Sequence, residues 1–164
     1  MKRYERTRAL VEGDASLARE IVRDIEAGAG SGIAPAISVL DEPHEELVMV
    51  QVRETAKGSL FYLGEALMTS CRVRVDGSVG LGLLLGSNRC RAYELAVIDA
   101  AFSGADAARL SSRWDKRIAI ESQRVRRREA VEQQLVERTK VDFSTMDEPG
   151  AARLEKACEG DEAR

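Results

Sequence analysis

The stretch RVRVDGSVGLGLLLG, residues 72–86, decides the fold, because it is either a strand hairpin or a glycine-rich phosphate loop. Asp76-Gly77 separates two apolar runs, and this dipeptide favours the positive φ angles of a two-residue hairpin turn. A dinucleotide-binding loop needs a third glycine where Leu85 stands, with a helix directly behind it. The stretch therefore predicts an antiparallel hairpin, in which Gly80 and Gly82 mark a bend or a close backbone approach.

The segments before this turn predict helices followed by strands. Apolar residues at spacing four predict helix over residues 4–27, with a break at Gly13-Asp14. Short strands are predicted at 36–40 and 45–54, with DEPH (41–44) as the turn between them. Residues 65–75 alternate, which predicts a strand with one buried face; that face holds Leu67, Thr69, Cys71, Val73 and Val75.

The segments after the turn predict two further helices, at 89–102 and at about 107–138. In the long helix an apolar stripe runs through Leu110, Trp114 and Ile118, weakens, and resumes at Val131 and Leu135. Such a helix cannot bury one continuous face in its own domain, so we expect it to lie against another chain. The expected architecture is α+β, with N-terminal helices, a mainly antiparallel central sheet and a long C-terminal helix.

The C-terminal part is predicted to begin with a short strand and to end in a tail. TKVDFSTM (139–146) has no obvious local partner, so we expect a strand that docks on another subunit. One domain is predicted over 1–146, and a charged, disordered tail over 147–164. Trp114, Val141, Phe143 and Met146 are the candidate interface residues; burial of the large ones in the chain's own core is the alternative.

Composition excludes several classes of protein. No window approaches the about 18 consecutive apolar residues of a membrane span, and the N-terminus lacks the apolar core of a secretory signal. Three well-separated cysteines suit a reducing cytoplasm. One histidine and no paired-cysteine spacing argue against a zinc site, and 4% aromatic residues are few for stacking bases.

Candidate polar chemistry is sparse. The acidic residues around His44 are interpreted as solvated charge at a turn, and Cys71 as a small core residue. Residues 113–140 carry a local charge of +4, but the mixed signs favour a solvated face or a polar protein interface over nucleic-acid binding. Arg72 and Arg74, on the second face of the hairpin, could bind an anion or a partner's carboxylate, and both alternatives stay open.

Three blocks together resemble the PhnG family, an accessory subunit of the bacterial carbon–phosphorus lyase system. They are GSLFYLGEALMTSCRVRVDGSVGLGLLLG (58–86), AVIDAAF (96–102) and TKVDFSTM (139–146). The resemblance covers most of residues 1–146. Family members often carry His-Ala-Glu where this chain has Arg91, Ala92 and Tyr93, so no role of that histidine or glutamate transfers. The positions that match the family motifs are Gly64, Glu65, Thr69, Asp76, Gly77, Gly86, Ile98, Asp99 and Asp142.

The resemblance implies a non-catalytic subunit of a cytoplasmic phosphonate-degrading complex. That complex joins an alkylphosphonate to the ribose of ATP and releases adenine, so ATP is a substrate of the complex and this chain binds no cofactor alone. The implied partners are PhnI-like, PhnH-like and PhnJ-like subunits, with no nucleic acid and no membrane. The alternatives are a stand-alone phosphate- or phosphonate-ester enzyme that uses Arg72 and Arg74 as an anion clamp, and a nucleic-acid module at 113–128.

Overall fold

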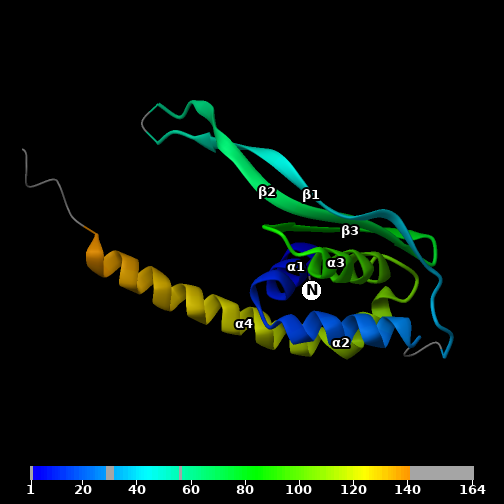
Figure 1. Ribbon diagram of the computed structural model, residues 1–164. Coiled ribbons are helices and arrows are strands. Elements are labelled where there is room, and N and C mark those ends of the chain that lie inside the picture. Colours follow the sequence, from blue (N-terminus) through cyan, green and yellow to red (C-terminus); the bar gives the residue numbers. More distant parts are fainter. Residues whose placement is uncertain (1, 29–31, 56, 141–164) are drawn as a thin grey trace, which may run out of the picture. The chain divides into compact units, whose positions relative to one another are not determined.

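Helices lie on one side of a three-stranded antiparallel sheet in the computed structural model, which describes residues 2–28, 32–55 and 57–140 (Figure 1). The predicted α+β architecture with N-terminal helices and a long C-terminal helix is confirmed. The predicted tail and the docking strand from residue 141 on lie outside the described residues, whereas Thr139, where that strand was predicted to begin, is the last residue of the long helix. In chain order the elements are α1 (Arg3–Glu12), α2 (Ala15–Glu26), β1 (Ile37–Arg53), β2 (Leu60–Val75), β3 (Ser78–Leu85), α3 (Arg89–Ala101) and α4 (Ala107–Thr139).

The chain divides into two compact units, residues 1–127 and 128–164. The first holds the sheet, α1 to α3 and the first part of α4; the second holds the remainder of α4. The predicted single domain over 1–146 stays a prediction, because its last residues lie outside the described part of the chain.

The sheet has the strand order β1-β2-β3, and the turn between β2 and β3 is the predicted hairpin. Asp76 has φ 46° and Gly77 has φ 87°, so both central turn residues lie in the left-handed region that Asp-Gly tolerates. The nucleotide-loop alternative fails here, because residues 78–85 are a strand that pairs with β2 along its whole length.

Helix α3 lies directly on one face of the sheet, and two glycines make this close approach possible. A Cβ on Gly82 would stand 1.8 Å from the Ala92 carbonyl oxygen, and one on Gly80 would stand 2.2 Å from the Ala96 carbonyl oxygen. Only glycine fits at these two positions, which confirms the predicted close backbone approach. Every residue from Leu95 to Ala101 is buried, so α3 forms the central layer of the core.

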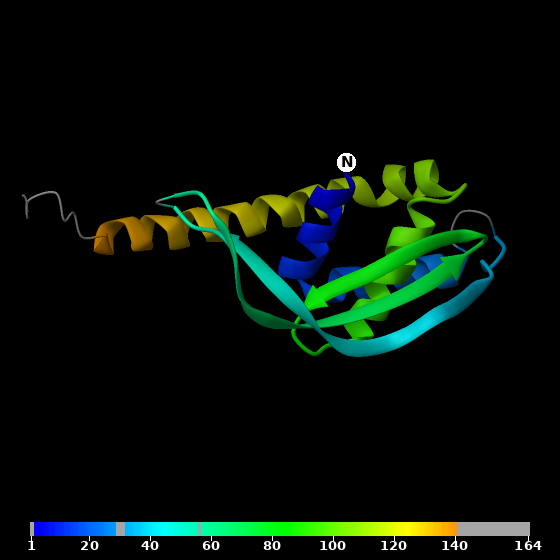
Figure 2. The ribbon, with the colours of Figure 1, turned by 90° about the horizontal axis from the view of Figure 1, so that it is seen from above.

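Beyond α3, helix α2 and the first part of α4 form the next layer (Figure 1, Figure 2). The apolar stripe of α2 faces the core, with Leu17, Ile21 and Ile25 buried. Asp14 caps this helix by accepting the Ser16 N–H at 2.8 Å, as expected for a helix start behind a glycine. The predicted α4 stripe of Leu110, Trp114 and Ile118 is buried, and Val125, which the sequence analysis missed, is buried too.

One strand assignment is wrong. Residues 41–44 are not a turn between two strands, because β1 runs without interruption from Ile37 to Arg53. The pairing with β2 shifts register between Val39 and Asp41 and again between Asp41 and His44, so the segment is a bulge. Pro43 is tolerated there because β1 is an edge strand, whose outward N–H groups need no partner strand.

Strands β1 and β2 continue well past the end of β3. The last residue of β3, Leu85, pairs with Met68 of β2. The paired residues 47–53 of β1 and 60–67 of β2 therefore form a two-stranded ribbon without a third strand, called the ribbon below (Figure 1). Residues 37–46 and 68–75 of the same strands, together with β3, form the covered sheet under α3.

Candidate protein-interaction surface

Arg72 and Arg74 lie exposed on the face of the sheet opposite α3. The Arg72 guanidinium donates to the carboxylate of Asp41, its partner across β1 and β2, and this contact raises the pKa of Arg72. This carboxylate belongs to the chain itself, so it is neither of the two ligands considered above, an anion or a partner's carboxylate. Arg74 lies opposite Ser38 and Val79.

The motif residues around the hairpin hold turns in place. The Thr69 hydroxyl donates to the Gly86 carbonyl at 2.5 Å and accepts the Asn88 N–H at 3.1 Å. Gly86 has φ 86°, and Asn88 in turn caps α3 by accepting the Arg91 N–H at 3.0 Å. The carboxylate of Asp76 accepts the Ala36 N–H at 2.8 Å, which ties the hairpin turn to the start of β1.

Asp99 forms a buried network between three elements. Its carboxylate accepts the Nε and Nη2 groups of Arg3 at 2.7 and 2.5 Å, and the backbone N–H of Leu81, on β3, at 3.1 Å. Arg6 lies 3.7 Å from the same carboxylate and stacks over the ring of Phe102 at 4.5 Å. Burial lowers the pKa of Arg6, and Asp99 acts in the opposite direction. Ile98, the motif neighbour of Asp99, is buried in the core.

Arg91, which stands where the family often has histidine, also binds backbone. Its guanidinium donates to the carbonyl of Ala15 at 2.8 Å and to that of Leu10, so it joins α3 to the junction of α1 and α2. Tyr93 lines an open groove of about 440 Å³ between α2 and α3. Charges in the groove are partly matched, because Arg19 pairs with Glu94 at 3.5 Å.

Trp114 lies in the core and is 6% exposed. Its indole N–H donates to the Asp24 carboxylate at 2.8 Å, and the guanidinium groups of Arg117 and Arg113 lie 5.2 and 6.0 Å from its ring. The core alternative therefore holds for this residue, which is not available as an anchor on the surface. The other predicted interface residues, Val141, Phe143 and Met146, lie outside the described residues, as does Asp142 of the family motif.

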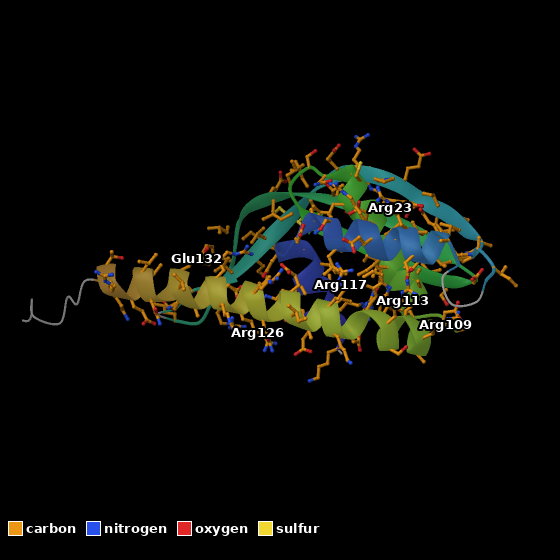
Figure 3. All side chains as sticks on the ribbon, turned by 90° about the horizontal axis from the view of Figure 1, so that it is seen from below. Arg23, Arg109, Arg113, Arg117, Arg126 and Glu132 are labelled. Carbon is orange, nitrogen blue, oxygen red and sulfur yellow. The ribbon has the colours of Figure 1, made fainter. Side chains whose placement is uncertain are left out.

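The basic run of α4 is matched by acidic side chains within the first unit. The pairs are Arg113–Asp24 at 2.8 Å, Arg117–Glu20 at 2.6 Å, Arg124–Glu121 at 3.2 Å and Arg126–Glu5 at 3.4 Å. Figure 3 labels Arg113, Arg117 and Arg126 along α4. Glu20 and Asp24 belong to α2, and Glu5 to α1. This arrangement matches the mixed-sign face predicted from the sequence, since four arginines of the run each have a carboxylate partner.

The surface feature that the sequence analysis missed is the ribbon. Leu47, Leu63 and Tyr62 are 64%, 66% and 63% exposed, and five further large apolar residues of the ribbon are exposed as well. Gly64 and Glu65 of the family motif lie in the ribbon, opposite Val50 and Met49. The signal was present in the unbroken apolar runs LVMV (47–50) and LFYL (60–63), which do not alternate as a strand with one solvated face should. A second exposed apolar row lies on the outer face of β3: Val79, Leu81, Leu83 and Leu85.

Within residues 2–28, 32–55 and 57–140, no group of three or more histidine, cysteine, aspartate or glutamate side chains is placed to hold a metal ion. Nor does any helix in this part of the chain have the length and apolar character needed to cross a bilayer.

Three features are typical of a subunit that works by contact with other proteins: paired surface charges, motif residues that hold turns, and a large exposed apolar ribbon. The chain matches the family model described as "Phosphonate metabolism protein PhnG" over residues 1–148, and it belongs to this family. It is 33% identical over 135 residues to the alpha-D-ribose 1-methylphosphonate 5-triphosphate synthase subunit PhnG of Rhizobium meliloti (strain 1021). The aligned part covers 82% of this chain and 79% of that relative.

Proposed function

We propose that this chain is a non-catalytic accessory subunit of an alpha-D-ribose 1-methylphosphonate 5-triphosphate synthase that acts in the cytoplasm. The similarity to a subunit of that name along 79% of the relative's length carries the proposal. The partners we propose are PhnI-like, PhnH-like and PhnJ-like subunits. ATP and an alkylphosphonate are the substrates of the complex, and this chain contributes no cofactor.

The physical character of the surface supports a subunit role. An isolated two-stranded ribbon is at best marginally stable in water, and large exposed apolar patches mark sites of protein contact. The stand-alone enzyme is less well supported, because Arg72 already pairs with Asp41 and is not a free anion clamp. The nucleic-acid module is less well supported because Arg113, Arg117 and Arg126 of α4 already pair with carboxylates of α1 and α2.

Reconstitution with the partner subunits tests the proposal. The chain is co-expressed with the PhnI-like, PhnH-like and PhnJ-like proteins of its own organism, and adenine release from ATP and methylphosphonate is measured. We expect release from the full set, no release from the isolated chain, and loss of the intact complex on gel filtration when the chain is omitted. Adenine release by the isolated chain, or a chain that never co-elutes with a partner, contradicts the proposal.

The C-terminal segment is a second proposed contact. A chain that ends at Lys140 lacks residues 141–146 of the predicted docking strand and keeps the described elements. We expect its recovery with the PhnI-like subunit to fall. Recovery at the full-length yield shows that this segment is not needed for docking.

A further inference from the structure

We infer that the ribbon is enclosed on both of its faces by an apolar cleft of a different subunit. This inference rests on the proposed function, since it names the part of the chain that enters the complex. The ribbon comprises residues 47–53 and 60–67, as defined above.

Both faces of the ribbon carry exposed apolar side chains. Successive cross-strand pairs point to opposite faces, so the pair Leu47–Leu67 lies on one face and the pair Val48–Ala66 on the other. Met49 shares the first face. Beyond a register shift between Val50 and Gln51, Tyr62 pairs with Gln51 and Phe61 with Val52, and Leu60 to Leu63 are all exposed. A strand pair that rests on a single surface needs apolar residues on one face only. Apolar residues on both faces indicate burial from both sides.

The exposed area matches that of a specific protein contact. Eight large apolar residues of the ribbon are exposed, each by about half. At roughly 80–100 Å² for each side chain they present on the order of 700 Å². A stable complex of standard size buries about 800 Å² on each partner, whereas monomers leave apolar patches of a few hundred Å². A single partner that covers both faces of the ribbon would therefore bury an area close to that of a standard stable complex.

A second copy of the chain fits the ribbon less well than a different subunit. In a two-fold dimer the same patch meets itself, so a contact between two ribbons buries one face of each and leaves the other face in water. The ribbon is also nearly free of charge apart from Arg53 and Glu65. We therefore expect the partner's cleft to be lined by apolar side chains, as the ribbon is.

The tip of the ribbon indicates that it passes through the cleft and does not end inside it. Ser59 donates to the Glu54 carboxylate at 2.7 Å, and the Arg53 guanidinium donates to the Gly58 carbonyl. Lys57 lies exposed in the same turn. A charged, internally bonded tip is costly to bury, so we place it in water beyond the cleft.

Single charges placed on each face test the inference in the co-expressed complex. Leu67→Asp charges the first face and Val48→Asp the second; Leu83→Asp, on β3, is the matched control, since the three side chains are 43%, 44% and 43% exposed. We expect each ribbon variant to lower recovery of the complex at least 10-fold and the control to stay within 2-fold. Circular dichroism and Tm of the isolated variants confirm that each one folds.

The outcomes separate this inference from the proposed function. If the unaltered chain recovers no partner, the proposed function fails. If it does recover partners, but one ribbon variant retains them or the control loses them equally, enclosure of both faces is overturned while the subunit role stands.

Hydrogen exchange gives an independent readout. We expect the amides of 47–53 and 60–67 to exchange rapidly in the isolated chain, and at least 10-fold more slowly in the complex, on both strands. Slow exchange in the isolated chain overturns the inference. Sedimentation then shows whether a second copy or the chain's own C-terminal part covers the ribbon.

Discussion

The two halves of the β1–β2 pair have different environments although they are the same two strands. In the covered sheet, Thr69, Cys71, Val73 and Val75 are buried against α3, and the residues between them are polar or charged. In the ribbon, apolar side chains occupy both faces and remain exposed. On β2, alternation therefore marks the half that a helix of this chain covers. Its absence marks the half for which residues 1–127 provide no covering helix.

The largest expected effect concerns the close contact between β3 and α3, which the ribbon lacks. Gly82→Val places side-chain atoms inside the space of the Ala92 carbonyl, so we expect a loss of more than about 3 kcal/mol in the free energy of unfolding, or no folded protein. Ala66→Val adds bulk at the ribbon and should change stability by less than about 0.5 kcal/mol. Urea titration of both variants measures the difference. Equal midpoints would contradict the close packing of α3.

The Asp99 network should have the next largest effect. Asp99→Ala leaves Arg6 buried without its carboxylate and removes the acceptor for the Leu81 N–H, so we expect a loss of about 2–3 kcal/mol. The matched control is Glu5→Ala, which removes an exposed carboxylate from Arg126 and should cost less than about 0.5 kcal/mol. Thermal unfolding compares the two. A small effect of Asp99→Ala would show that the network does not stabilise the covered sheet.

Truncating one valine in each half of the strand pair compares them directly. Val73 is fully buried and Val48 is exposed, so Val73→Ala should cost about 2 kcal/mol and Val48→Ala less than about 0.5 kcal/mol in the isolated chain. In the complex, the effect of Val48→Ala should appear as weaker binding. A large stability loss from Val48→Ala in the isolated chain would mean that the ribbon is already covered.

The smallest effect concerns Glu45, which lies at the boundary between the covered sheet and the ribbon. Hydrogen bonds from Arg89 and Ser87 lower the pKa of Glu45 to about 2. Its ionised form therefore stabilises the fold above the ordinary glutamate pKa, and this stability is lost as the pH falls from about 4.5 towards 2. Glu45→Gln should lower Tm at pH 7, and the difference from the unaltered chain should shrink on acidification. Glu46→Gln, on the opposite face, is the control for general charge effects; a gap that does not change with pH would contradict the assignment.

Local signals explain what the sequence predicted correctly. Asp76-Gly77 predicts its turn because few residues tolerate those φ angles, and the helices follow from apolar spacing over ten or more residues. The turn predicted at residues 41–44 was wrong because it also rested on local residue types: Asp, Glu and Pro are typical of turns. Only the pairing with β2, more than 25 residues away, keeps them in the strand as a bulge.

The interaction surface could be predicted only in part, because its character depends on contacts between distant segments. The unbroken apolar runs LVMV and LFYL indicate that both faces of these strands need a cover, but the sequence does not say whether a helix of this chain or another protein supplies it. The pairing of Arg72 with Asp41 joins residues 31 positions apart, and that of Arg3 with Asp99 joins residues 96 positions apart. Neither pair has a local signal in the sequence.

The hydrogen bond from Leu81 to Asp99 has a consequence for the chain before it is assembled. An unpaired outer strand as apolar as β3 is a template on which further copies could stack into a growing fibre. Here the acceptor that an incoming strand would supply is already present, held by the guanidinium of Arg3. In a chain that has not yet bound its partners, this hydrogen bond therefore hinders the addition of a strand from a second copy at the middle of β3.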